Sequence, residues 1–238
     1  MLSYILEKWQ RVQYLYYGIG FKDMTLRIAQ KIISPLYQHE VGYIIVRNVQ
    51  ARDPLVPQSG VKDNVGTECI ILETLESLRC VECEIPSPIT VNKLKSHLVH
   101  GSESIIVLAR RPNSTGSGNE VVGYRTCQRG IFFTPWLKKS LSSDILFVLD
   151  TEVLPKYRGQ RIQHIIRAAT YEYCQINGLK KICGVVLAHN RPSIVAHTRA
   201  SEEKIAVGTV ELVSVFGGLF KWVTPWEKIK IALENSGR

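Results

Sequence analysis

The sequence predicts an α/β protein of the α+β type, in which a mixed β-sheet is flanked by helices. Two observations predict this class. Residues 144–198 read as strand, turn, helix and strand, which requires two parallel strands with a crossover. Residues 104–110 and 120–127 read as an antiparallel hairpin around the breaker-rich segment 112–119. The sheet should therefore contain both parallel and antiparallel pairs.

The strand–turn–helix–strand segment has the clearest pattern. An apolar run over residues 145–149 leads through a turn at residues 158–159 to a helix. Gly178 should end this helix, because glycine adopts the left-handed conformation there without the cost of a Cβ. A short buried strand over residues 182–187 follows. The apolar positions that recur at helical spacing are Ile162, Ile165, Ile166, Ala169, Tyr173 and Ile176.

The turn between the strand and the helix is a candidate phosphate site. The first N–H groups of a helix have no partner within the helix, and its dipole is positive at that end. Phosphate and pyrophosphate groups bind at such helix N-termini. An ordinary strand-to-helix turn is the alternative interpretation of the dipeptide Arg158-Gly159 alone.

The spacing Val153-x-Pro155-x-Tyr157-Arg158-Gly159, followed by a helix, a strand and Asn190-x-Pro192-Ser193, resembles the GNAT superfamily of acyl-CoA-dependent N-acyltransferases. The resemblance extends over residues 102–215 and is close over residues 153–198. It implies a sheet that is splayed at its centre, a turn that holds the CoA pyrophosphate, and an asparagine near the pantetheine arm. The cofactor-binding residues that it implies are Val153, Arg158, Gly159, Gln160, Arg161, Ile162, Gln163, Asn190 and Ser193.

Two residues of the turn depart from the family pattern. Arg161 and Gln163 stand where the family has small residues, which let the backbone approach the pyrophosphate closely. Long side chains at these positions could obstruct that approach. Arg161 could instead add a charge-assisted contact to a phosphate.

Three residues are candidates for catalysis. Asp150 and Glu152 are two positions apart on the strand before the turn, so they share a face, and either could accept the proton of an attacking amine. The alternative is a pair of solvent-facing or salt-bridged carboxylates. His197 lies seven residues after Asn190, where many family members have a tyrosine that protonates the CoA sulfur. Histidine can serve as that acid near neutral pH.

The resemblance implies an enzyme that transfers an acyl group from acetyl-CoA or another acyl-CoA to a primary amine of a small molecule. Two alternatives remain open. One is a relative that uses an acidic acyl-carrier protein, which the net charge of +9 would suit. The other is a module of the same fold that has lost CoA binding and acts as a scaffold. No aromatic-studded basic motif indicates nucleic-acid binding.

The predicted organisation is an N-terminal amphipathic helical extension over residues 1–40 and a GNAT-like domain over residues 41–238. The extension could pack on the domain, pair with a second subunit or contact a membrane surface peripherally. No run of about 18 apolar residues occurs, and the start lacks a secretory pattern, so we expect a cytoplasmic address. The oligomeric state is not predicted.

Several residues outside this segment are expected to have structural roles. Cys80-x-x-Cys83 lacks a second pair at ligand spacing, so we expect reduced, buried cysteines and no metal site. His97 and His100 should be surface histidines. Residues 132–139 should form an irregular aromatic segment, in which Phe133 and Trp136 either line the acceptor site or belong to the core.

Overall fold

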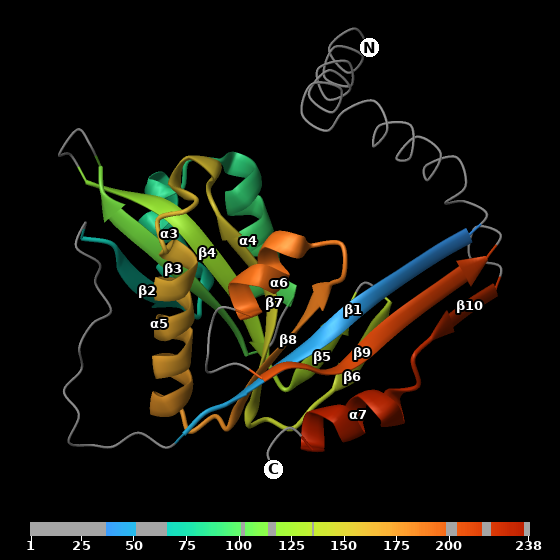
Figure 1. The fold of residues 1–238 in the computed structure, drawn as a ribbon. Coiled ribbons are helices and arrows are strands. Elements are labelled where there is room, and N and C mark those ends of the chain that lie inside the picture. The colour runs from blue at the N-terminus through green and yellow to red at the C-terminus, as the bar shows by residue number, and fades with distance from the viewer. Residues whose placement is uncertain are drawn as a thin grey trace, which may run out of the picture. The chain divides into compact units, whose positions relative to one another are not determined.

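The computed structural model describes residues 37–50, 66–100, 103–113, 118–134, 136–198, 204–215 and 220–235 (Figure 1). The predicted N-terminal helices lie outside these residues. The chain divides into two compact units. One contains Met1–Val41 and Glu211–Thr224, and the other contains Gly42–Val210 and Pro225–Arg238. Each unit is described by itself below.

The larger unit contains a mixed sheet with the strand order β9-β1-β8-β7-β4-β3-β2. The pair β7–β8 is parallel, whereas β8–β1, β7–β4, β4–β3 and β3–β2 are antiparallel. The predicted fold class is therefore confirmed. The strands are β1 (Tyr37–Asn48, from Gly42), β2 (Glu68–Leu72), β3 (Ser104–Pro112), β4 (Asn119–Arg129), β7 (Ile145–Val153), β8 (Lys181–Leu187) and β9 (Lys204–Val215, to Val210).

Helices cover both faces of this sheet, as Figure 1 shows. The side chains of strand β3 are buried on both sides of the sheet, which requires a layer of helices on each face. Its side chains at Ile105 and Val107 pack in one cluster with Ile166 of α5 (Ile162–Ile176). Those at Ile106 and Leu108 pack in a second cluster with helices α3 (Leu75–Val81) and α4 (Pro88–His100). A continuous apolar run is typical of a strand covered on both faces.

The helix α5 begins and ends where the sequence predicts. Its apolar stripe meets the sheet, and Gly178 has a φ of +65°, the left-handed conformation expected after a helix. The other helices among the described residues of this unit are η1 (Glu82–Glu84), η2 (Pro155–Tyr157), α6 (Arg191–Thr198) and α7 (Trp226–Asn235).

The sheet opens between β7 and β8. The parallel pairing joins Ile145–Val148 only to Lys181–Gly184, although both strands continue beyond it. Leu149 forms a β-bulge, because Val148 is paired with Cys127 and Asp150 is paired with the preceding Thr126. A bulge bends its strand and increases the local twist. The bulge and the short pairing together produce the central splay that the resemblance implies.

The prediction of an irregular segment over residues 132–139 is wrong. The chain forms a hairpin of β5 (Ile131–Thr134) and β6 (Leu137–Ser140). Phe132 is buried, with its ring centroid 5.2 Å from that of Phe147 and 5.5 Å from that of Trp226. The neighbouring Phe133 is 43% exposed. This alternation is that of a strand with one buried face.

The smaller unit contains a hairpin. Residues Leu212 to Val215 of β9 pair with β10 (Phe220–Val223) in antiparallel register. Thr224 closes the pair, since its N–H donates to the carbonyl of Glu211 and its Oγ1 accepts from the N–H of Glu211 at 2.8 Å. The hairpin is therefore fixed at its open end as well as along its ladder.

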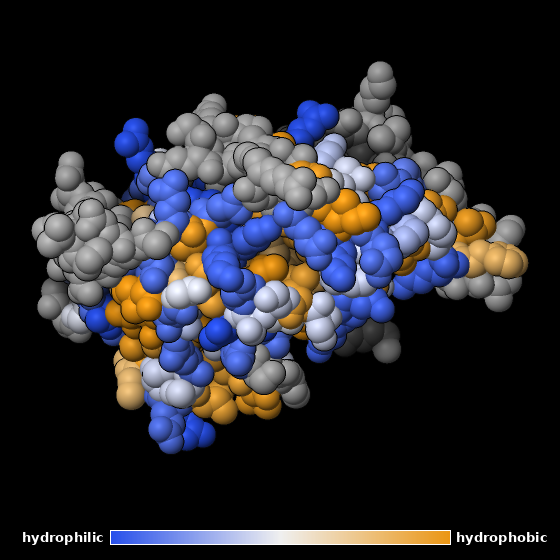
Figure 2. Space-filling model, turned by 90° about the horizontal axis from the view of Figure 1, so that it is seen from below, coloured by the Kyte–Doolittle hydropathy of each residue, from blue (hydrophilic) through white to orange (hydrophobic). Residues whose placement is uncertain are grey.

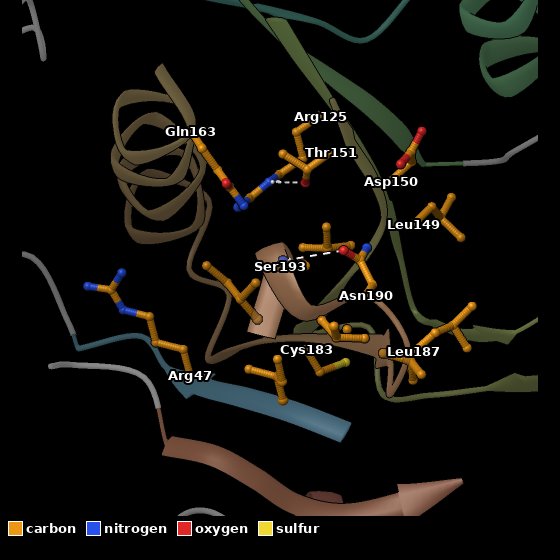
Figure 3. Close-up of a pocket in the computed structure, with 16 residues that line it drawn as sticks. Arg47, Arg125, Leu149, Asp150, Thr151, Gln163, Cys183, Leu187, Asn190 and Ser193 are labelled. Carbon is orange, nitrogen blue, oxygen red and sulfur yellow. Dashed lines mark hydrogen bonds between the residues drawn. The ribbon is translucent and has the colours of Figure 1, made fainter. Parts of the chain in front are cut away.

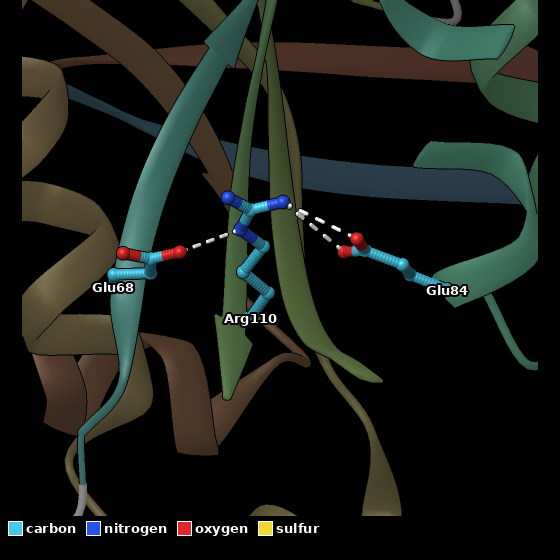
Figure 4. Close-up of polar contacts among 3 residues, drawn as sticks. All are labelled: Glu68, Glu84 and Arg110. Carbon is cyan, nitrogen blue, oxygen red and sulfur yellow. Dashed lines mark hydrogen bonds and ion pairs between the residues drawn. The ribbon is translucent and has the colours of Figure 1, made fainter. Parts of the chain in front are cut away.

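Arg110 joins three elements at one edge of the larger unit (Figure 4). Its Nε donates to Oε1 of Glu68 on β2 at 2.8 Å, and its Nη1 donates to Oε1 of Glu84 in η1 at 3.2 Å. The side chains of Arg110 and Glu84 are largely shielded from solvent and that of Glu68 is partly shielded, so these charge-assisted bonds are screened less than fully exposed pairs. The contacts hold the segment that leads into α4 against the sheet.

The surface carries large apolar side chains on several elements. Those exposed among the described residues are Ile71, Val99, Phe133, Ile176, Val195, Phe220, Trp222 and Ile231. On the face that Figure 2 shows, hydrophobic residues are interspersed with hydrophilic ones. Single exposed apolar residues of this kind are common on proteins. No helix in the described part of the chain is long and apolar enough to cross a membrane.

His97 is half-buried, which corrects the prediction of a surface histidine; the side chain of His100 lies outside the described residues. The Nε2 of His97 lies 3.1 Å from the carbonyl oxygen of Cys127 on β4. Helix α4 turns this residue toward the sheet, and its spacing from Leu94 places it beside the apolar face. Burial lowers the pKa of His97, and hydrogen bonds to backbone carbonyls offset this only in part.

We expect acid to destabilise the protein through His97. Because its pKa is lower in the folded chain, the unfolded chain binds the proton first as the pH falls below about 6.5. The stability contributed by the neutral imidazole is present above that pH and is lost as the pH falls through the folded pKa. Urea unfolding at pH 7.5 and 5.5 should show a smaller loss of stability for His97→Gln than for the wild type. The exposed His164→Gln should behave like the wild type; equal losses in all three proteins would contradict the prediction.

Candidate active site

A cavity of about 260 Å³ lies where β7 and β8 diverge (Figure 3). Its walls are the bulged part of β7, most of β8, parts of β1 and β4, the first turn of α5 and the start of α6. The lining residues are Ile45, Arg47, Arg125, residues 148–151, Gln163, residues 182–187, Asn190 and Ser193. Four predicted site residues are among them: Asp150, Gln163, Asn190 and Ser193.

The wall formed by β7 has an open backbone edge. Beyond Val148, the edge of β7 that faces β8 has no strand partner among the described residues. An extended ligand can pair with such an edge through main-chain hydrogen bonds, as peptides do when they add a strand to a sheet. The cavity can therefore hold a linear molecule that carries amide groups.

The turn after β7 leads to a helix with free donors. The chain passes from η2 through Gly159, whose φ is +79°, to Arg161 and then into α5. No side chain caps α5, and within the described residues the N–H groups of Ile162 and Gln163 donate no hydrogen bond. These donors and the positive end of the helix dipole form a site that suits an anion. The side chain of Gln163 points into the cavity (Figure 3).

Arg161 adopts the left-handed backbone conformation, which a glycine at this position would adopt without cost. Its φ is 60° and its ψ is 12°, the left-handed region that an L-residue enters at a cost of about 1–2 kcal/mol. Its side chain is exposed and does not line the cavity. The left-handed turn before α5 is therefore formed with an arginine in place of a glycine.

We expect Arg161→Gly to stabilise the protein by up to about 1 kcal/mol. The substitution removes the left-handed strain, and the greater freedom of glycine in the unfolded chain cancels part of that gain. Arg158→Gly is the matched control, because Arg158 has an ordinary φ of −65° and should gain nothing. Urea unfolding measures both, and equal effects of the two substitutions would contradict the assignment of strain to Arg161.

Other residues of the turn stabilise its own structure. Arg158 Nε donates to the carbonyl of Val153 at 3.1 Å, and Gln160 Oε1 accepts from Arg111 Nη1 at 2.8 Å. Val153 packs against the core, and Gly159 is exposed. These residues border the helix N-terminus without lining the cavity.

Asn190 begins the helix α6. Its Oδ1 accepts from the N–H of Ser193 at 3.3 Å, and its carbonyl accepts from the N–H of Ile194 at 3.1 Å. This is the geometry of an N-cap residue, and it holds both Asn190 and Ser193 at the cavity wall (Figure 3). His197 lies in the last turn of α6, but its side chain lies outside the described residues.

The two carboxylates on β7 belong to one polar network. Asp150 Oδ2 lies 2.5 Å from Nζ of Lys93 on α4, and that ammonium also donates to the hydroxyl of Tyr124 at 3.0 Å. Tyr124 in turn donates to Oε2 of Glu152 at 2.6 Å. Asp150 and Glu152 thus share a face, as predicted, and Asp150 is salt-bridged while also lining the cavity.

The network raises the pKa values of Lys93 and Tyr124. Burial disfavours the charge on Lys93, but the hydrogen bonds to Asp150 and Tyr124 outweigh it and raise the pKa of Lys93. Burial, with the hydrogen bond to Glu152, raises the pKa of Tyr124 to about 12. Lys93 is therefore an ammonium at neutral pH, and Tyr124 is a neutral donor.

Arg125 lines the cavity but is not among the site residues predicted from the sequence. It is 4% exposed, and its Nε donates to Oγ1 of Thr151 at 3.0 Å while its Nη1 donates to Oγ1 of Thr170 at 3.4 Å. Arg47, whose guanidinium stacks 3.9 Å from the ring centroid of Tyr171, also lines the cavity. A charged residue inside the apolar run of residues 121–127 was the available signal for Arg125.

The structure gives no sign of a metal centre in the described part of the chain, where no three His, Cys, Asp or Glu side chains gather suitably. All six cysteines are free. Cys127, Cys174 and Cys183 are buried as expected, but Cys80 and Cys83 are exposed, which corrects the prediction for that pair. They lie at the end of α3 and in η1, where Leu78 and Val81 take the inward positions.

Comparisons with known proteins give similarities only among solved structures. No family model and no curated protein matches the chain. An aminoglycoside N-acetyltransferase, AAC(6')-Iy in complex with a bisubstrate analogue of CoA, is 12% identical with a TM-score of 0.40, over 58% of this chain and 91% of that one. A functionally unknown protein from Staphylococcus epidermidis is 12% identical with a TM-score of 0.45, over 78% and 65%.

A Drosophila protein is 15% identical with a TM-score of 0.44, over 84% of this chain and 59% of that one. Acetyltransferases are thus among the solved structures that this chain resembles, alongside proteins without a stated activity. At these identities and TM-scores, the similarities say nothing about substrate.

Proposed function

We propose that the protein is a GNAT-type N-acyltransferase that moves an acyl group from acetyl-CoA or another acyl-CoA to a primary amine of a small molecule. The observation that carries the proposal is the cavity at the splay between β7 and β8, with the uncapped N-terminus of α5 at one end of it. An acyl-CoA has an extended arm with two amide groups and a pyrophosphate, so its chemistry matches both features.

The donor would be held by backbone groups more than by side chains. The N–H groups of Ile162 and Gln163 would bind the pyrophosphate, and Arg158 and Arg161 would add positive charge nearby. The pantetheine arm would pair with the open edge of β7 after Val148. Asn190 and Ser193 would contact the arm from α6.

The acyl transfer needs a base, a donor to the oxyanion and an acid. Asp150 lines the cavity and would take the proton of the attacking amine, with Glu152 as the second carboxylate on that face. An N–H of the unpaired part of β7 would stabilise the developing oxyanion on the thioester. His197 would protonate the departing sulfur.

A second candidate function follows from Arg161 and Gln163. Their side chains replace the small residues of the family pattern, and a protein in which they block the pyrophosphate would be a scaffold or would accept acyl groups from a carrier protein. The exposed side chain of Arg161 favours the enzyme, because it leaves the helix N-terminus accessible.

Thermal unfolding with ligands tests the proposal. Acetyl-CoA and CoA at about 100 times their dissociation constants should each stabilise the protein by about 2.7 kcal/mol, whereas pantetheine without phosphates should stabilise it less. Gln163→Glu is the matched variant, because it keeps the side-chain size and places a negative charge at the helix N-terminus. The shift should shrink in this variant. No shift in the wild type would overturn CoA binding and favour the carrier-protein or scaffold function.

A further inference from the structure

A primary amine of the chain itself is paired with a carboxylate that lines the cavity. Lys93 reaches from α4 to β7, where its Nζ is 2.5 Å from Asp150 Oδ2 and 3.0 Å from the hydroxyl of Tyr124. Asp150 lines the cavity. The side chain of Lys93 is 51% exposed, so its nitrogen is held in place without being enclosed.

The position of this amine is specific to Lys93. Tyr124 is buried, its ring centroid is 5.4 Å from Nζ, and its hydroxyl is fixed by Glu152. Lys95, two residues further along the same helix, instead donates to Oε1 of Glu82 at 2.8 Å. Helix geometry therefore directs one lysine toward the splay and the other toward η1.

We propose that Lys93 is an acyl acceptor, so that the protein acylates itself at this residue when an acyl-CoA occupies the cavity. The inference rests on the proposed function. A held amine beside a carboxylate gains from proximity as well as from the base, and effective concentrations in well-oriented intramolecular reactions are very high. The ordinary side chain of a surface lysine has neither advantage.

The step balances with groups that are present. The ammonium of Lys93 gives one proton to Asp150, and its nitrogen then attacks the thioester carbonyl carbon. The new C–N bond forms, the C–S bond breaks, and a second nitrogen proton goes to the departing sulfur. The products are an amide on Lys93, the free thiol of CoA, and one proton on Asp150, which passes to solvent. The amide carries no charge, so the ion pair with Asp150 is lost.

Peptide mass spectrometry of the purified full chain tests the proposal. After incubation with acetyl-CoA, the acetyl group should accumulate on Lys93 at least about 100-fold faster than on Lys95. Both lysines are paired with a carboxylate, but only Asp150, the partner of Lys93, lines the cavity and can act as a positioned base there. Asp150→Asn should remove most of that difference. Glu82→Gln, which frees Lys95 from its own carboxylate, should leave the rate at Lys93 unchanged and Lys95 slow. The rate per molecule should not depend on protein concentration.

Two controls separate the possible failures. Heat-unfolded protein gives the background of chemical acetylation, in which Lys93 and Lys95 should be alike. Equal rates at the two lysines in the folded protein would overturn the proposal. An unmodified Lys93 in a protein that acetyl-CoA stabilises would also overturn it, while leaving the proposed function intact. An unmodified Lys93 together with no stabilisation by acetyl-CoA would overturn both.

Discussion

Replacing Asp150 by asparagine should lower the rate of acyl transfer to a small amine by about 10²- to 10⁴-fold, the usual contribution of a positioned general base. Of the two predicted carboxylates, only Asp150 lines the cavity. Glu152 does not line it and accepts a hydrogen bond from the hydroxyl of Tyr124. Asparagine has nearly the same shape, so the cavity wall should be preserved. The amide cannot accept a proton from the amine.

The measurement is the release of CoA thiol with saturating acetyl-CoA and a panel of primary amines. Glu152→Gln is the matched control on the same face of β7, and we expect it to retain more activity than Asp150→Asn. The stabilisation by acetyl-CoA should be unchanged in both variants, because neither residue is expected to contact the pyrophosphate. A large loss in Glu152→Gln with little loss in Asp150→Asn would assign the base to Glu152 instead.

Replacing Phe132 by alanine should destabilise the protein by about 3–5 kcal/mol, the cost of deleting a buried aromatic ring and leaving a cavity. Phe132 makes an edge contact with Phe147 and a tilted contact with Trp226. Aromatic pairs of this kind add to the effect of area burial. Phe147 lies in the part of β7 that pairs with β8, just before the two strands diverge. The aromatic cluster therefore supports the point at which the cavity begins.

Phe133→Ala provides the matched control for this prediction. Phe133 is the next residue on β5 but faces solvent, so its removal should change stability by no more than about 0.5 kcal/mol. Urea unfolding with linear extrapolation gives both values. Similar losses in the two variants would mean that the core is not organised around Phe132.

The elements of this fold that depend on local pattern could be predicted from the sequence. The bounds of α5 follow from the spacing of its apolar residues and from Gly178, and the strand at β3 follows from its apolar run. The turn at Arg158 and the cap at Asn190 are also local features, because their hydrogen bonds join residues within five positions of one another. The spacing of apolar residues shows which side of a segment is buried, and this spacing can be read from the segment alone.

The cavity itself could be recognised only in the tertiary structure. The ion pair of Lys93 with Asp150 joins residues 57 positions apart, and the bond of Arg125 to Thr170 spans 45. Strand β1 lies between β8 and β9 although it is the first of the described strands along the chain, and no local pattern indicates this. The hairpin of β5 and β6 has no clear pattern in the sequence either, since its strands have only four residues each.

The sequence by itself therefore determined the mixed sheet, the turn and helix that suit an anion, and the face shared by Asp150 and Glu152. Only the tertiary structure decided that Lys93, Tyr124 and Arg125 join them and that His97 turns inward. The physical reason is that the buried face of a helix or strand appears in its own sequence as apolar residues at a regular spacing. A pairing between two charged or polar side chains instead depends on the order and spacing of strands that meet only in the folded chain.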